Sequence, residues 1–184
     1  MRPYLLPAVI GLVIGGIIHL VLVLMLPGLI STSAWDRIGA LSGDGNGPVI
    51  LAAPAPGEPN PLRLDPALAT VACRLDLSSA PGHVAGVLPQ SFWSVAVYGR
   101  NGQVIYSTTN RDGLGRALDL GVFTAQQVRL LAEQRYDVTD DLIIVEAEED
   151  AALVVVRLAP PHEVARERYE AALKALGCGS IGLI

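Results

Sequence analysis

The sequence predicts an α+β protein, in which a single N-terminal transmembrane helix precedes a domain with a mostly antiparallel β-sheet and two helices. Three observations carry this prediction: a long uncharged run opens the chain, a hairpin signal lies near its middle, and two amphipathic helical patterns follow. With 51% hydrophobic residues, the chain has enough apolar surface to form a core. A net charge of −5 with a single lysine argues against nucleic-acid binding.

The N-terminal run is long enough to cross a membrane. No Asp, Glu, Lys or Arg occurs between Pro3 and Trp35. As a helix, the stretch from Leu5 to Leu26 would span about 33 Å, against a hydrocarbon core of about 30 Å. We therefore predict a transmembrane anchor over residues 1–30. The alternative is a cleaved signal peptide, although its apolar region is usually shorter, about 7–15 residues.

The flanks of this run predict its orientation. Arg2 and the amino terminus lie on one side, whereas Asp36 and Arg37 cancel on the other. The positive-inside rule therefore places the short N-terminus in the cytoplasm and the rest of the chain outside it.

One face of the anchor has the pattern of a helix-association surface. Gly11 and Gly15 form a Gly-x-x-x-Gly motif, and His19 continues the same face one turn later. Small residues let helix backbones approach closely, and a histidine can donate a hydrogen bond across the contact. The alternative is chance, because glycine is common in membrane helices.

Residues 31–66 are predicted to connect the anchor to the domain. The first part is a juxtamembrane segment with Trp35 at the depth of the membrane interface. The glycines and prolines of residues 42–66 favour an extended arm, with an edge strand at residues 49–51. We place the folded α+β domain at residues 67–184.

The domain opens with strand signals. Residues 69–77 mix β-branched and apolar side chains and end at a turn cluster. Residues 92–98 and 103–107 form a predicted hairpin around Asn101-Gly102, the sequence typical of a type I′ turn.

This turn type would fix the register of the hairpin. It would place Val97 opposite Tyr106 and Gly99 opposite Val104. One covered face would then carry five large side chains: Trp93, Val95, Val97, Val104 and Tyr106.

Two helices and a second hairpin are predicted in the C-terminal half. Thr124 to Gln127 reads as a capping box that starts a helix ending near Gln134, with Val128, Leu131 and Ala132 inward. Residues 142–148 and 152–158 are predicted strands on either side of an acidic turn. The second helix would begin at Pro161 and end at Gly177. Its predicted apolar stripe is Ala165, Tyr169, Ala172, Leu173 and Leu176.

We predict no catalytic, cofactor-binding or metal-ligating residue. His83 and His162 lack partners at ligand spacing, so they are interpreted as surface histidines. The loop Asn110, Arg111 and Asp112 combines charge with turn formers. It is either an Asx-turn with a solvated salt pair or a rim loop that binds an anionic ligand or partner through Arg111.

Cys73 and Cys178 are the only cysteines. In an oxidising compartment such a pair is expected to form a disulfide, here between a predicted strand and the residue after the second helix. The alternative is a pair of buried free thiols that pack as small apolar residues.

Several motifs form a recognisable set. They are Asp65-Pro66, Val71–Ser78, Phe92–Tyr98 and Asn110-Arg111, together with Asp36–Leu41, an anchor ending in Leu-Pro and Cys178. This set, which covers most of the chain, resembles a bacterial family, the domain of unknown function 1254, in its short membrane-anchored form. The resemblance implies a companion membrane protein of unknown function, and it implies no activity or catalytic residue.

Two classes of function follow. The first is a non-catalytic interaction module, anchored in the bacterial inner membrane with its domain in the periplasm, that pairs with the companion membrane protein. The second is an envelope small-ligand binder or hydrolase with a pocket near Trp93, Tyr106 and Arg111.

Overall fold

The computed structural model describes residues 4–29, 34–42, 47–112, 115–133 and 142–181. The chain divides into two compact units, Met1–Ser33 and Ala34–Ile184. The first unit contains helix α1 (Leu5–Leu29). Within α1, the 22 residues Leu5–Leu26 are long and apolar enough to cross a membrane, and their side chains are exposed.

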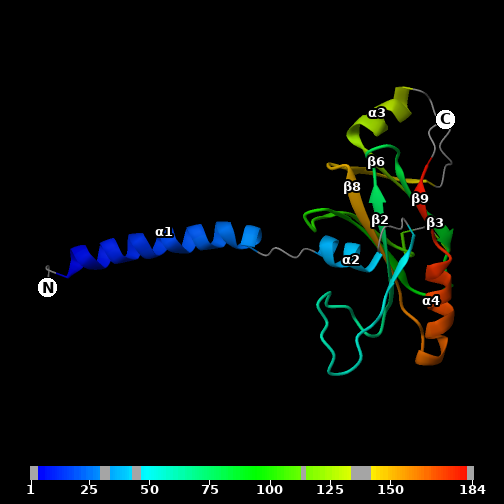
Figure 1. The fold of residues 1–184 in the computed structure, drawn as a ribbon, viewed down its shortest axis with the longest axis horizontal. Helices are drawn as coiled ribbons and strands as arrows, with labels where there is room; N and C mark the ends of the chain where they lie inside the picture. The colour runs from blue at the N-terminus through cyan, green and yellow to red at the C-terminus, as the bar shows by residue number, and fades with distance from the viewer. Residues whose placement is uncertain (1–3, 30–33, 43–46, 113–114, 134–141, 182–184) are drawn as a thin grey trace. The chain divides into compact units, whose positions relative to one another are not determined.

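The second unit contains two sheets, as Figure 1 shows. The five-stranded sheet has the order β1 (Val49–Leu51), β2 (Ala69–Asp76), β8 (Ala151–Leu158), β4 (Trp93–Gly99) and β5 (Val104–Thr109). The four-stranded sheet has the order β7 (Ile143–Ala147), β6 (Ala117–Thr124), β3 (Gly82–Val87) and β9 (Gly177–Ser180). In the described part of the chain, β6 and β7 pair in parallel and the other pairs are antiparallel, so the predicted α+β class is confirmed.

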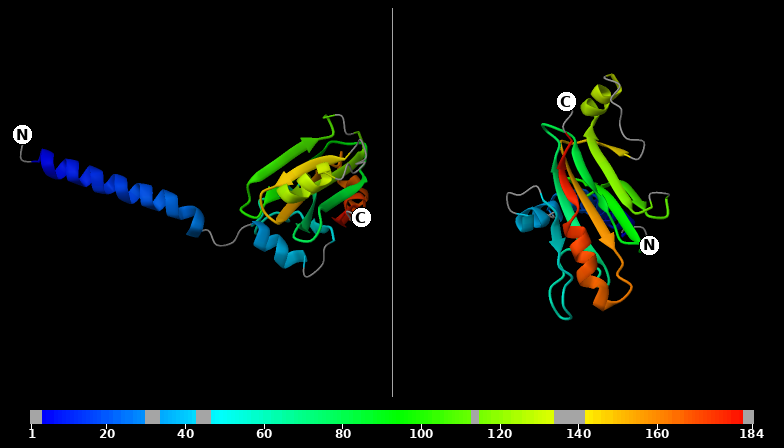
Figure 2. Two further views of the ribbon diagram at one scale, coloured as in Figure 1. Left: turned by 90° about the horizontal axis from the view of Figure 1, so that it is seen from above. Right: turned by 90° about the vertical axis from the view of Figure 1, so that its right-hand side faces the viewer.

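Three helices accompany these sheets. They are α2 (Ala34–Ser42), α3 (Ala125–Glu133) and α4 (Arg166–Lys174), the last preceded by a 3₁₀ turn at Glu163–Ala165. Helices α3 and α4 lie at opposite ends of the unit (Figures 1 and 2).

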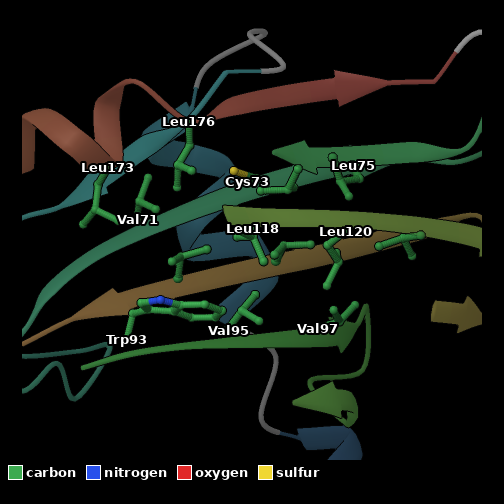
Figure 3. Close-up of a cluster of buried hydrophobic side chains, with 14 of the residues drawn as sticks. Val71, Cys73, Leu75, Trp93, Val95, Val97, Leu118, Leu120, Leu173 and Leu176 are labelled. Carbon is green, nitrogen blue, oxygen red and sulfur yellow. The ribbon is translucent and has the colours of Figure 1, made fainter. Parts of the chain in front are cut away.

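The main core lies between the two sheets. Alternate residues of β2, β4 and β8 meet the inner faces of β3 and β6, and α4 adds Tyr169 and Leu173. Trp93 and Leu173 are completely buried. Figure 3 shows side chains of both sheets and of the α4 segment gathered in this core.

A second, smaller core covers the outer face of the five-stranded sheet. Trp35 and Ile38 of α2 pack there against residues of β2 and β8, and Leu62 and Leu64 of the arm pack at its edge. Residues 34–66, which we predicted as a segment separate from the domain, thus lie in the same compact unit as residues 67–184. The predicted edge strand is present as β1, which pairs with β2.

Trp35 does not have the environment that we predicted for it. It is 7% exposed in the second core, and the guanidinium of Arg74 lies 4.6 Å from the centre of its ring. A Cβ on Gly39 would come within 2.5 Å of that guanidinium, so the glycine lets α2 approach Arg74 closely. The apolar outer face of the sheet therefore buries an indole that we had assigned to the membrane interface.

The β4–β5 hairpin differs from the prediction by a bulge. Val97 pairs with Tyr106 as expected, but Tyr98, not Gly99, pairs with Val104. The turn closes with a hydrogen bond from the Gly102 N–H to the Gly99 carbonyl, and Gly102 has φ 81°. This is a type I turn followed by a left-handed glycine, not a type I′ turn. As a result Val104 is exposed, whereas Ile105 packs against the main core.

The predicted second hairpin is wrong. Strand β7 pairs with β6 in one sheet, whereas β8 is the central strand of the other. The acidic segment between them therefore joins two sheets. Helix α3 makes the crossover between β6 and β7, which the parallel pairing of these strands requires.

The two predicted helices are present, but the burial of α3 and the first residue of α4 differ from the prediction. In α3, Val128 and Leu131 are half-buried, but Ala132, which we also predicted to face inward, is exposed. Helix α4 begins at Arg166 and not at Pro161, because the first residues after the prolines form the 3₁₀ turn.

Candidate functional site

Cys73 and Cys178 form a disulfide that joins the two sheets. Cys73 lies on β2, Cys178 lies on β9, and their Cα atoms are 5.8 Å apart. Cys73 is completely buried in the main core. The bond therefore fastens the last described strand to the centre of the domain.

The predicted loop at residues 110–112 is built as a tight local turn. The Asp112 carboxylate accepts hydrogen bonds from the Thr108 hydroxyl at 2.7 Å and from the Thr109 N–H at 2.8 Å. These bonds, with a further one from the Thr109 hydroxyl, hold the pKa of Asp112 below its ordinary value. Asn110 donates from Nδ2 to the Ser91 carbonyl. Two of the three side chains thus shape the loop.

Arg111 extends over the ring of Phe92, a residue that we did not include in the predicted pocket. Its guanidinium lies 5.9 Å from the centre of the Phe92 ring, and Phe92 is 44% exposed. Trp93 is buried in the main core and donates from Nε1 to the Gly115 carbonyl at 3.3 Å. Tyr106 packs half-buried against the same core. None of the pockets described below is lined by Trp93, Tyr106 or Arg111.

The predicted helix-association face lies on α1. A Cβ added at Gly11 or Gly15 would meet nothing within 4 Å, so both positions are open for close approach. Among the residues that the structure describes, His19 has no hydrogen-bond partner.

A histidine–aspartate pair was missed by the sequence analysis. His83 Nε2 lies 2.7 Å from Asp119 Oδ1, and each side chain is about one-third exposed. His83 of β3 pairs with Gly121 on one side and Gly179 on the other, so no side chain stands directly beside it. The pair went unnoticed because neither β3 nor β6 was predicted.

The second missed feature is an apolar pocket beneath α2, with a volume of about 190 Å³. Trp35 and Ile38 of α2 line one side, and Leu153 and Val155 of β8 line the other. Arg157, next on the same face of β8, lines it too and donates from Nη2 to the Tyr98 hydroxyl at 3.3 Å.

Two more open pockets occur in the described part of the chain. One lies between the β4–β5 turn and the carboxylates of Glu146, Glu148 and Glu149, and the other lies between the arm and α4. Glu146, Glu148 and Glu149, whose carboxylates line the first, are exposed to solvent. In the second, Arg166 is held by Glu163 and by the carbonyls of Leu68 and Pro66.

No protein-family model matches the chain, and no curated protein matches it. Among solved structures, the chain is similar to the VPA0106 protein from Vibrio parahaemolyticus, with 8% identity and a TM-score of 0.50 over 64% of this chain. It also matches an uncharacterized protein from Burkholderia cenocepacia, with 12% identity and a TM-score of 0.41 over 68% of this chain. The matches span 28% and 33% of those longer proteins. The Vibrio structure therefore shows a shared fold.

Proposed function

We propose that this protein is a single-pass protein of the bacterial inner membrane, whose periplasmic domain is a non-catalytic interaction module for a companion membrane protein. Two features support the location. The chain has an N-terminal apolar helix of membrane-spanning length, and its domain has an internal disulfide. Disulfides persist in oxidising compartments such as the periplasm and are rare in the cytoplasm.

The observation that carries the proposed partner is His19. It lies within the apolar span Leu5–Leu26, where water is absent and a polar side chain is costly unless it forms a hydrogen bond. No described residue of this chain supplies that bond. A second transmembrane helix would supply it, and Gly11 and Gly15 on the same face would let the two backbones approach.

The family resemblance supports the companion. We propose that the chain is a short member of the domain of unknown function 1254 family. Its two most specific motifs, Val71–Ser78 and Phe92–Tyr98, contain strands β2 and β4, which flank the central strand β8. The Vibrio protein has this fold within a longer chain.

The proposal is tested by capture from native membranes. The full chain, tagged after Ile184, is purified in mild detergent, and co-purifying proteins are identified by mass spectrometry. We expect one membrane protein in stoichiometric amount. Gly15→Ile should remove it, because a branched side chain would hold the helices apart.

Gly16→Ile is the matched control. It makes the same change in volume and hydropathy, and a Cβ there also meets nothing within 4 Å, but Gly16 lies about 100° around the helix from Gly15. We expect it to retain the partner. Purification of the chain alone, or only with copies of itself, would contradict the proposed companion. Equal capture by both variants would contradict the proposed helix face.

A further inference from the structure

We propose that the pocket beneath α2 is a binding site for a medium-chain carboxylate, a short apolar chain that ends in a carboxylate group. This goes beyond the interaction module, because it gives the domain a small-molecule ligand. It also differs in position from the pocket predicted near Trp93, Tyr106 and Arg111.

The floor of the pocket comes from the central strand. Leu153, Val155 and Arg157 alternate along β8, so they point to the same outer face of the sheet. Val155 pairs with Ala72 of β2 and with Ala96 of β4. Small side chains on both sides of Val155 leave space above the middle of the sheet.

The roof and walls come from α2 and the arm. Trp35 and Ile38 lie across this space, and Leu51, Leu62 and Leu64 line it from the side. Trp35 is held in place by Arg74 and by Arg100, whose guanidinium is 5.6 Å from the centre of the ring. The apolar part of the pocket is therefore built from packed elements of the domain.

Arg157 gives the pocket a site for an anion. A guanidinium has five N–H donors, and within the described part of the chain Arg157 uses one of them to bond the Tyr98 hydroxyl. Arg157 takes part in none of the ion pairs that the described part of the chain shows, such as His83 with Asp119 and Arg166 with Glu163. Arg157 is half-buried, where a charge without a counter-charge is costly. A carboxylate would fit the planar donor group with two parallel hydrogen bonds.

The volume limits the length of the chain. An apolar cavity of about 150 Å³ accommodates benzene. The pocket here, at about 190 Å³, is somewhat larger and is open at one side. An acyl group of about eight carbons fits this space, whereas the two long chains of a phospholipid do not.

The test uses the fluorescence of Trp35, which lines the pocket. The chain has two tryptophans, and the other, Trp93, is completely buried in the main core. Bromine quenches tryptophan on contact. We expect 8-bromooctanoate to quench the full chain in lipid nanodiscs saturably, and 8-bromooctanol to do so at least about tenfold more weakly, because it lacks the anion. No saturable quenching, or equal quenching by the acid and the alcohol, would overturn the proposal.

Arg157→Gln tests the anion site directly. We expect it to weaken binding of 8-bromooctanoate about tenfold and to leave 8-bromooctanol unchanged. The matched control is Arg129→Gln, since Arg129 is exposed on α3 and does not line the pocket. Equal affinity of the two variants for the acid would overturn the role of Arg157. The comparison of acid and alcohol on the unmodified chain decides the proposal if Arg157→Gln fails to fold.

Discussion

At the scale of single residues, Gly102 sets the register of the β4–β5 hairpin. Its φ of 81° is a left-handed conformation that costs an ordinary side chain about 1–2 kcal/mol. Gly102→Ala should therefore destabilise the domain by about 1 kcal/mol, and Gly102→Asn by less, because asparagine tolerates this conformation better. Thermal unfolding of the full chain in detergent, followed by near-ultraviolet circular dichroism, measures both. Equal losses would show that the conformation of residue 102 is not what matters.

We expect the stability of the loop at residues 110–112 to depend on pH through Asp112. The Thr108 hydroxyl, then the Thr109 N–H and hydroxyl, lower the pKa of this carboxyl from 3.8. Because the folded pKa is depressed, the stabilisation is complete above the unfolded pKa and is lost as the pH falls through the folded pKa. Asp112→Asn should therefore be less stable than the unmodified chain at neutral pH, by an amount that shrinks in acid below pH 3.8. If the difference in stability between Asp112→Asn and the unmodified chain were as large at about pH 2 as at neutral pH, this role of Asp112 would be contradicted.

At the scale of elements, the start of α3 depends on Gln127. Its Oε1 accepts from the Thr124 N–H at 2.8 Å, and its Nε2 donates to the Leu77 carbonyl at 2.8 Å. Gln127→Ala should cost about 1–2 kcal/mol, because it removes the side-chain bond to the Thr124 N–H and a bond to the segment after β2. The matched control is Gln126→Ala, an exposed neighbour, which should cost under about 0.5 kcal/mol. Urea unfolding compares them, and equal costs would rule out this role for the cap.

We expect the disulfide, which holds β9 to the rest of the domain, to contribute strongly to the free energy of unfolding. Its cysteines are 105 residues apart, and closing a loop of about 100 residues is worth up to about 4.7 kcal/mol in the chain-entropy model. Cys73→Ala with Cys178→Ala should lower stability by up to that amount. A reductant should destabilise the unmodified chain and leave the double variant unchanged. Equal stability of the oxidised chain and the double variant would contradict a stabilising bond.

The elements predictable from sequence were those with strong local signals. The capping box at Thr124 and the apolar strands β2, β4 and β8 are of this kind. Strands β3, β6 and β9 were missed, because their glycines weaken the strand pattern. A Cβ at Gly82, Gly86 or Gly121 would come within 3 Å of a leucine or phenylalanine side chain, so these positions require glycine for packing. Gly86 is packed against Leu176, far away in the chain, and such a contact leaves no local signature in the sequence.

At the scale of the whole molecule, the candidate sites also differ in whether the sequence could predict them. The pairing of Cys73 and Cys178 was predictable because the chain has no other cysteine. The pocket was not, because Trp35, Tyr98 and Arg157 come from three distant segments that meet only when α2 covers the sheet. The continuous apolar run of β8 did contain a clue: a strand buried on both faces requires a cover on each.

The proposed function requires above all that an uncleaved apolar helix anchors an oxidised domain. The most direct test is the intact mass of the chain purified from membranes and alkylated in denaturant, before and after reduction. We predict the mass of all 184 residues with no alkyl adduct before reduction and two adducts after it. Two adducts without reductant would contradict the disulfide and its oxidising compartment, and a mass lacking the first 30 or so residues would contradict the anchor.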